Sequence, residues 1–171
     1  MRKKRDHIPG AIYHVTSRTN NKIQVFDHKL GRKILLLTLR GAKEKFGFKL
    51  YNFCIMPTHI HLLLAPAEKT NISQIMHWIK TSSAKSWNCI HGSTDHLWGA
   101  RFFARPVNNI RDFFTVQNYI DQNAVKAGLS CTPQEWKASG AYYIANNIKG
   151  IVDYTVLDRL AHIKLLPHTP K

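Results

Sequence analysis

The feature that most constrains the fold is a short apolar run that begins at His59 and ends at Ala65. Because side chains alternate between the two faces of a strand, His59, His61 and Leu63 would face one side, and Ile60 and the two other leucines would face a core. Pro57, just before the run, fits the entry to a strand, where no ladder hydrogen bond needs its missing N–H. The run therefore predicts a strand that is buried on one face and carries two imidazoles on the other.

The two imidazoles of this strand define a candidate metal site. Side chains two residues apart on one strand face are roughly 7 Å apart. At that separation, His59 and His61 can converge on a single divalent ion. Histidines in this arrangement also occur as ordinary polar-face residues, so the pair alone leaves both interpretations open.

The charge balance of the chain indicates a polyanionic partner. Lysine and arginine number 25 against 10 aspartate and glutamate residues, which gives a formal net charge of +15 over 171 residues. Nucleic acid is the commonest partner of so basic a small protein. The hydrophobic fraction of 44% is ordinary and is sufficient for one packed core.

Cysteine usage and apolar patterning predict a cytoplasmic protein without membrane association. The three cysteines, Cys54, Cys89 and Cys131, are odd in number, widely spaced and without a C-x-x-C motif, as expected of reduced thiols. No apolar run reaches the 18 or more residues of a membrane span. The basic residues 2–5 are not followed by the apolar segment of a secretory signal.

Hydrophobic periodicity predicts the element order β-α-β-β-α-β. The expected strands are 11–18, 48–55, 59–65 and 98–107, and the expected helices are 29–46 and 72–91. Gly47 ends the first helix, and Asn71 with Gln74 forms a capping box at the start of the second. This order is that of the α+β ferredoxin-like fold, a four-stranded antiparallel sheet with helices on one face.

A third helix follows the sheet and completes a single domain over residues 1–171. Asn109 can cap this helix, and Gly128 is a natural stop. Its apolar stripe would contain Ile110, Phe113, Phe114 and Ile120. Tyr119 and Asn123 are four residues apart, so a phenol and an amide would share one face. The core spans about 9–130, and the extension 131–171 is expected to pack over the sheet and to contain a terminal helix over 153–166.

Three segments carry a family resemblance in the order in which they occur. They are residues 9–18 (PGAIYHVTSR), 56–63 (MPTHIHLL) and 119–129 (YIDQNAVKAGL). Over residues 9–140 the chain resembles the single-tyrosine HUH transposases of bacterial insertion sequences and their REP-associated relatives. It departs from the usual pattern at Ala124, where proline is common, and at Thr58, where asparagine is common. Neither change removes a functional side chain of the family.

The resemblance implies the chemistry and the role of each site residue. Tyr119 would be the nucleophile, and His59, His61 and Asn123 would bind Mg²⁺ or Mn²⁺. The enzyme would cleave and rejoin single-stranded DNA at hairpin-flanked sites through a covalent 5′-phosphotyrosine. Such transposases act as monomers or homodimers, and the third motif is closer to the REP-associated branch, which favours a monomer.

Two other functions agree with parts of the sequence. A domesticated module could bind repetitive DNA hairpins without cutting them, although such a module would not need all four site residues. A metal-dependent hydrolase could use water and retain Tyr119 for structure alone. Predicted phosphate contacts are residues 2–5, Arg18, Lys80, Lys85, Arg101 and Arg105, and predicted base-stacking residues are Trp98, Phe102 and Phe103.

Overall fold

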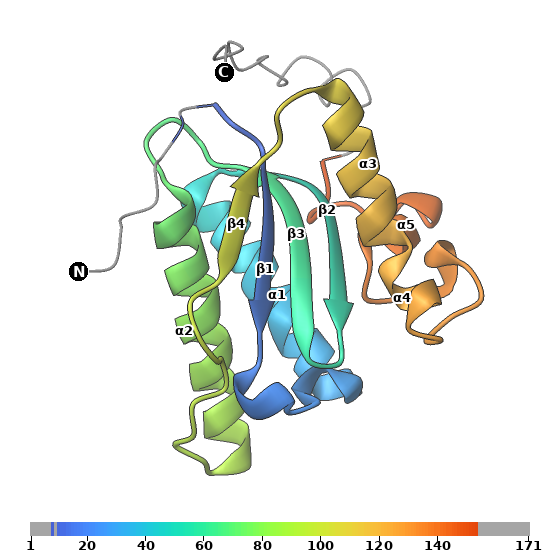
Figure 1. Cartoon of the computed structure of the whole chain (residues 1–171). Coiled ribbons are helices and arrows are strands. Elements are labelled where there is room, and N and C mark those ends of the chain that lie inside the picture. The colour runs from blue at the N-terminus through green and yellow to red at the C-terminus, as the bar shows by residue number, and fades with distance from the viewer. Residues whose placement is uncertain (1–7, 9, 154–171) are drawn as a thin grey trace.

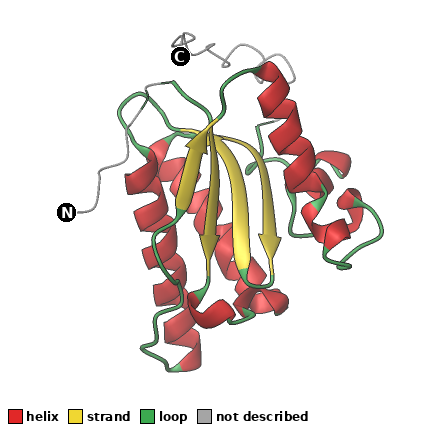
Figure 2. Ribbon diagram, in the orientation of Figure 1, coloured by secondary structure: helices red, strands yellow, loops and turns green. Residues whose placement is uncertain are grey.

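A four-stranded antiparallel sheet forms the centre of the molecule in the computed structural model, which describes residue 8 and residues 10–153 (Figures 1 and 2). The strands are β1 (Tyr13–Arg18), β2 (Lys49–Met56), β3 (His59–Ala65) and β4 (Phe103–Pro106). Their spatial order is β2-β3-β1-β4, and every neighbouring pair is antiparallel. This order confirms the predicted ferredoxin-like topology.

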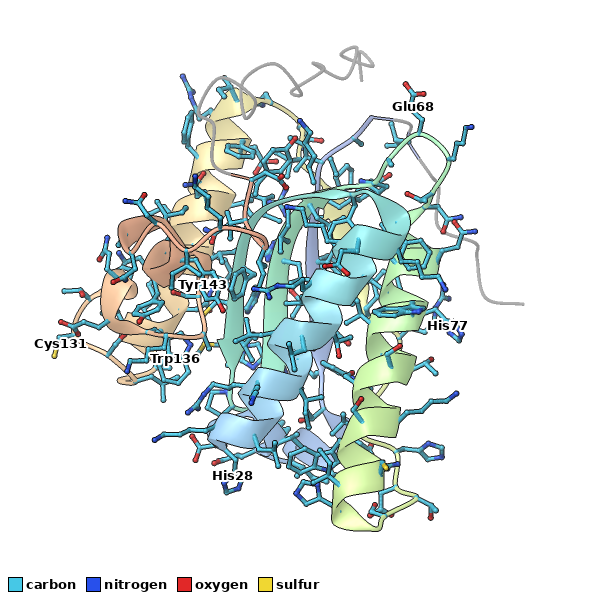
Figure 3. All side chains as sticks on the ribbon, turned by 180° about the vertical axis from the view of Figure 1, so that it is seen from behind. His28, Glu68, His77, Cys131, Trp136 and Tyr143 are labelled. Atoms are coloured by element: carbon cyan, nitrogen blue, oxygen red, sulfur yellow. The ribbon has the colours of Figure 1, made fainter. Side chains whose placement is uncertain are left out.

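Two long helices cover one face of the sheet, as Figure 3 shows from behind. They are α1 (Lys29–Phe46) and α2 (Ile72–His91), and two short 3₁₀ turns, η1 (Asn20–Lys22) and η2 (Val25–Asp27), precede α1. The predicted caps are present. Gly47 ends α1 in the left-handed conformation at φ 63°, and Asn71 and Gln74 exchange backbone-to-side-chain hydrogen bonds of 3.0 Å.

A third helix, α3 (Ile110–Asp121), packs on the opposite face of the sheet and creates a second, smaller apolar cluster. The residues that this helix buries are Phe113, Val116 and Ile120. The prediction that Ile110 and Phe114 belong to the buried stripe is wrong, because both are exposed. One side of α3 faces the sheet, and these two side chains lie away from it.

The helix that carries Tyr119 also ends earlier than predicted. It stops at Asp121, and a separate turn of helix, α4 (Asn123–Lys126), follows after Gln122. Gly128 then takes a φ of 68°, so the predicted glycine stop terminates α4 instead of one long helix.

The segment before β4 is not a strand over the whole predicted range 98–107. Only Phe103–Pro106 pairs with β1, while Trp98 forms an isolated bridge with Thr19 and donates from its indole N–H to Ser83 Oγ at 2.9 Å. Trp98 and Phe102 are buried in the larger core, so the prediction that they stack on bases is wrong. Phe103 is 61% exposed and remains available for such a contact.

The described part of the C-terminal extension packs against β2, as expected. It contains η3 (Pro133–Glu135) and α5 (Gly140–Ala145). Trp136, labelled with Tyr143 in Figure 3, donates to the carbonyl of Ile55 at 3.0 Å, and the Tyr143 ring meets that of Phe53 edge-on at 5.4 Å. The terminal helix predicted over 153–166 lies, apart from its first residue, outside the described residues, as do the basic residues 2–5. Within the described ranges, no helix is long and apolar enough to cross a membrane.

Candidate active site

The two strand histidines and the helix tyrosine meet on the sheet face that α3 partly covers. The ring centroids of His59 and His61 are 5.1 Å apart, and that of Tyr119 lies 5.5 Å from His61. Val116 and Ile120, buried on either side of Tyr119 along the helix, fix the rotation of α3 that turns the phenol toward the imidazoles. The fold thus brings the nucleophile predicted from the resemblance beside the predicted metal pair.

Each histidine of the pair has a partner at Nδ1. His61 Nδ1 lies 3.1 Å from His14 Nε2 and 3.3 Å from Thr16 Oγ1, both on the neighbouring strand β1. His59 Nδ1 lies 3.0 Å from Thr58 Oγ1. The Nε2 atoms of the pair are therefore the nitrogens suited to an ion, since the other ring nitrogen of a metal-binding histidine is usually held by a hydrogen bond.

Burial keeps these imidazoles neutral at neutral pH. Desolvation first and the Arg105 guanidinium second lower the pKa of His14 to about 4, against a smaller raising effect of the Asp112 carboxylate. Desolvation also lowers the pKa of His61 to about 3, with smaller contributions from His59, His14 and the nearby Arg18. The pKa of His59 is lowered in the same way, by burial first and by Arg18 second. A neutral imidazole is the form that binds a metal.

The donor atoms present fit a hard or borderline divalent ion with few protein ligands. In the part of the chain that the structure describes, no group of three or more His, Cys, Asp or Glu side chains could hold a metal. An ion would therefore use the two imidazoles together with other oxygen donors. Asn123 donates from Nδ2 to the Tyr119 carbonyl at 2.8 Å, so its side-chain oxygen is the atom suited to a ligand role. Two imidazoles and an amide oxygen fit Mn²⁺ or Mg²⁺.

Tyr119 is half-exposed at the opening of the site. Lys126 Nζ lies 5.9 Å from the centroid of its ring. A cavity of about 290 Å³ lies beside the tyrosine and is lined by His14, Arg105, Thr115, Val116 and Tyr119. The phenol is therefore open to a substrate on one side and adjoins the imidazoles on the other.

A buried polar contact anchors the helix end that carries Tyr119. Asn52, fully buried in β2, donates from Nδ2 to Asp121 Oδ1 at 2.8 Å and to the Gln117 carbonyl at 3.4 Å. Its own oxygen accepts from the backbone N–H of Phe53 at 2.8 Å. A hydrogen bond from a buried amide to a carboxylate is among the stronger ones in proteins, so the tyrosine helix is held firmly to the sheet.

The residues predicted to contact phosphates fall into two groups. Arg18 lies opposite His59 in the β1–β3 pairing, at the edge of the site. Arg105 also lies near the site, but both of its terminal nitrogens contact the Asp112 carboxylate at 2.9 Å. Lys80 donates to the Ala100 carbonyl at 3.0 Å.

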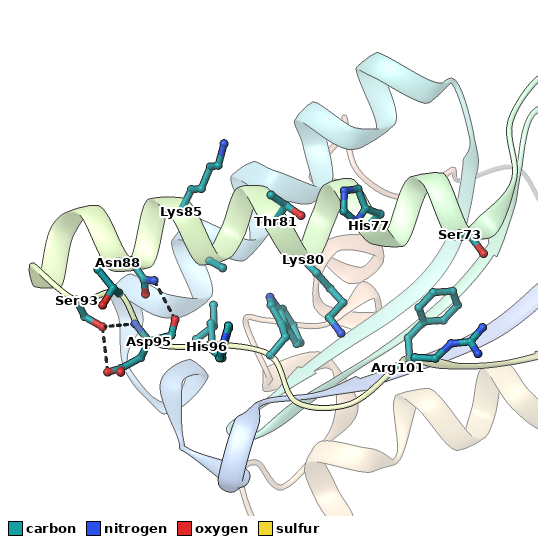
Figure 4. A pocket seen from close by; sticks show the side chains of 15 residues that line it. Ser73, His77, Lys80, Thr81, Lys85, Asn88, Ser93, Asp95, His96 and Arg101 are labelled. Carbon is teal, nitrogen blue, oxygen red and sulfur yellow. Dashed lines mark hydrogen bonds between the residues drawn. The ribbon is translucent and has the colours of Figure 1, made fainter. Parts of the chain in front are cut away.

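The second group faces a separate cavity between α2 and the segment that precedes β4 (Figure 4). Its volume is about 880 Å³, and Lys80, Lys85 and Arg101 are among its lining residues. In Figure 4, Lys80 extends from α2 toward the opposite segment, whereas Lys85 points away from it. Because α2 covers the face of the sheet opposite α3, this cavity is distinct from the site at Tyr119.

Four residues of the site were not predicted from the sequence: His14, Thr16, Thr58 and Lys126. Strand alternation already placed His14 and Thr16 on one face of the first strand. What the sequence lacked was the β1–β3 register, which sets Thr16 opposite His61 and brings His14 within reach of it.

Comparison with known proteins agrees with this geometry. The family model described as "Transposase IS200 like" matches residues 7–123. A REP-associated tyrosine transposase, solved bound to a REP hairpin, superposes with a TM-score of 0.72 at 20% identity, covering 91% of this chain and 92% of the other. A candidate transposase from Deinococcus radiodurans R1 superposes with a TM-score of 0.51 at 23% identity, covering 71% and 97%. No curated protein matches the chain significantly.

A ferredoxin-like sheet with a His-x-His pair beside a tyrosine-bearing helix defines the single-tyrosine HUH class. The family model spans more than half of the residues, from before β1 to the start of α4. The chain belongs to the IS200-like transposase family.

Proposed function

We propose that this transposase cleaves and rejoins single-stranded DNA through a covalent 5′-phosphotyrosine on Tyr119, with a divalent metal bound by His59 and His61. One observation carries the proposal. Tyr119 and the histidine pair are about sixty residues apart in the sequence, and their rings meet at 5.5 Å. A purely structural tyrosine on α3 would have no reason to lie half-exposed beside the buried imidazole of His61 and the half-buried imidazole of His59.

In the cleavage step, the Tyr119 oxygen attacks the scissile phosphorus, the bond to the 3′ oxygen breaks, and the departing strand leaves as a 3′-hydroxyl. The phenol proton passes to solvent, and the departing 3′ oxygen takes a proton from solvent. The ammonium of Lys126, 5.9 Å from the centroid of the Tyr119 ring, favours the phenolate that forms. His59, His61 and Asn123 would hold Mg²⁺ or Mn²⁺, which supplies Lewis-acid stabilisation of the phosphodiester. Attack of a 3′-hydroxyl on the phosphotyrosine reverses the step and joins two strands without a nucleotide cofactor.

The proposed substrate is a DNA hairpin with a single-stranded flank. The similar transposase was solved with a REP hairpin, and the net charge of +15 favours a polyanion. Arg18 is the proposed phosphate contact nearest the metal pair, because it lies opposite His59. Arg105 is paired with Asp112, whose negative charge offsets that of the guanidinium. We therefore expect Arg105 to attract the DNA phosphates less strongly than Arg18 does.

We further propose that Tyr119 acts on the histidine pair of its own chain. The Asn52–Asp121 hydrogen bond, which helps to orient α3, joins the tyrosine helix to the sheet that carries the histidine pair of the same chain. This contact supports the proposal that one chain supplies both the tyrosine and the histidines, as a monomeric enzyme would.

The test uses end-labelled single-stranded hairpin oligonucleotides taken from the DNA that flanks the gene. The protein is incubated with them and Mn²⁺ or Mg²⁺ and then run on a denaturing gel. We expect a labelled band at the mass of the protein, lost in Tyr119→Phe and in chelator. Tyr143→Phe is a matched control. This tyrosine is in the C-terminal extension, where its ring meets that of Phe53 edge-on, so its substitution should leave the adduct unchanged.

Other outcomes separate the alternatives. Cleavage without a labelled protein band would favour a hydrolase that uses water. Tight binding of the same hairpin with neither cleavage nor adduct would favour a domesticated binding module.

A further inference from the structure

The site contains a third imidazole for which the proposed reaction has no role. His14, on β1, is buried, and its ring lies edge to edge with that of His61, with centroids 5.4 Å apart and an interplanar angle of 23°. Thr16 lies directly opposite His61 in the strand pairing, and His14 lies opposite Leu63. His14 therefore reaches His61 diagonally across two strands, a distance that long side chains span on one sheet face.

Which ring nitrogen of neutral His61 carries the hydrogen depends on the hydrogen-bond partner at Nδ1. A neutral imidazole has one N–H and one lone pair. If His61 is to offer the lone pair of Nε2 to an ion, its hydrogen must be on Nδ1, and that hydrogen needs an acceptor. His14 Nε2 lies at 3.1 Å and Thr16 Oγ1 at 3.3 Å. The first distance is within the usual hydrogen-bond range and the second is just beyond it, so His14 is the better acceptor.

We infer that His14 is a positioning residue, which accepts a hydrogen bond from His61 Nδ1–H and thereby presents His61 Nε2 to the metal. This inference rests on the proposed metal role of the histidine pair. It requires His14 to carry its own hydrogen on Nδ1, since a single ring nitrogen cannot both accept from His61 and hold a proton in the same direction.

The surroundings of His14 hold its ring in the orientation that this role needs. The His61 ring lies nearly coplanar with it, and the Tyr119 ring lies at a steep angle to it at a centroid distance of 5.8 Å. Across β1–β4, the residue opposite His14 is Arg105, which is itself fixed by two hydrogen bonds to Asp112. A ring packed on these sides cannot rotate freely, so its Nε2 stays directed at His61.

The other metal histidine has an equivalent partner. Thr58 Oγ1 lies 3.0 Å from His59 Nδ1, and a hydroxyl can accept from an N–H there. Each histidine of the pair thus has its own Nδ1 partner, supplied by β1 for His61 and by the residue next in sequence for His59. Partners of this kind fix the tautomer and the direction of a metal ligand.

The direct test is a long-range ¹H–¹⁵N NMR correlation on the full, metal-free chain at neutral pH, which reports the tautomer of each histidine. We expect His61 with its hydrogen on Nδ1. A wild-type His61 protonated on Nε2 would overturn the inference, and this measurement needs no variant to fold.

Variants extend the test to metal affinity, measured as Mn²⁺ binding by electron paramagnetic resonance. His14→Phe keeps an aromatic ring without a hydrogen-bond acceptor and should raise the Mn²⁺ Kd about 10- to 100-fold. His14→Gln restores an acceptor near the former Nε2 and should recover much of that loss. Thr16→Val removes the longer contact at constant volume and should leave the Kd unchanged.

Two patterns of result would reject the inference. The first is an unchanged Mn²⁺ Kd in a folded His14→Phe protein. The second is a Kd that rises in Thr16→Val but does not rise in His14→Phe. His61→Ala separates this failure from failure of the proposed function. Mn²⁺ binding that survives in His61→Ala would reject the metal site itself, whereas binding lost there but intact in His14→Phe would reject only the role of His14.

Discussion

The buried histidines make the fold sensitive to mild acid, and His14 is the residue on which this is best measured. Burial lowers the pKa of His14 to about 4 and that of His61 to about 3, whereas an unfolded histidine titrates near 6.5. Between these values the unfolded chain binds protons that the folded chain excludes. The stability that comes from keeping these histidines neutral is therefore complete above pH 6.5, and the free energy of unfolding falls as the pH drops toward the folded pKa values.

The size of the effect follows from the pH chosen. At pH 5, both folded histidines are still neutral, and the pH is about 1.5 units below the unfolded pKa. Since one pKa unit corresponds to about 1.4 kcal/mol, protonation stabilises the unfolded chain by about 2 kcal/mol for each histidine. The two together give about 4 kcal/mol, a large part of the 5–15 kcal/mol that is typical of a whole domain.

The assay is urea unfolding at pH 8 and pH 5 in the presence of a chelator, on the wild type and on His14→Phe. Carboxylates and all other histidines titrate in both proteins, so their contributions cancel in the comparison. We expect the wild type to lose about 2 kcal/mol more than the variant between the two pH values. Equal losses would refute the reasoning, because His14 would then have the same pKa in the folded and unfolded chains.

Three further experiments test which chain's histidines the tyrosine on α3 uses and which contacts hold this helix to the sheet. A mixture of Tyr119→Phe and His61→Ala proteins should form no covalent adduct with labelled hairpin DNA, because each chain uses its own tyrosine; an adduct in the mixture would show that chains exchange this helix. Asn52→Ala should lower the free energy of unfolding by about 2 kcal/mol, because the Asp121 carboxylate loses a buried hydrogen bond, and an unchanged urea midpoint would contradict this. Phe113→Ala should cost about 3–5 kcal/mol in a thermal or urea melt, since the ring is wholly buried between α3 and the sheet, and a loss below about 1 kcal/mol would show that this contact is dispensable.

Local signals in the sequence were sufficient for the elements that build the sheet and its first two helices. The Asn71–Gln74 capping box and the left-handed Gly47 act over a few residues, so they can be recognised without knowing what the helices pack against. The alternation from His59 to Ala65 likewise determines which side chains share a face. These are the parts of the fold for which prediction and structure agree most closely.

Errors arose where burial depends on a distant element. Trp98 and Phe102 lie in an aromatic segment that also contains Arg101 and Arg105 and was predicted as a strand, but both rings are buried in the core instead of lying in a strand paired with β1. On α3, the predicted stripe contained Phe114, whereas the helix buries Val116, and the position of the sheet decides which side of the helix is covered. In both cases the deciding contact lies far away in the sequence.

The candidate site was partly predictable for the same reason. The histidine pair followed from strand alternation, whereas the roles of Tyr119 and Asn123 rested on the family resemblance and stay predictions. The position of His14 beside His61 could not be derived, because it depends on how β1 aligns with β3.

That alignment has a consequence for how the site is encoded. On the face covered by α1 and α2, Tyr13 and Val15 pair with Leu64 and Leu62, and these apolar contacts determine the strand register. A slip of one residue would turn every side chain of β1 to the other face and bury His14 beneath the long helices. The hydrophobic layer on one face of the sheet thus determines where the polar side chains of the other face lie. Substitutions that preserve this layer can change the residues proposed to contact DNA while the imidazoles keep their positions.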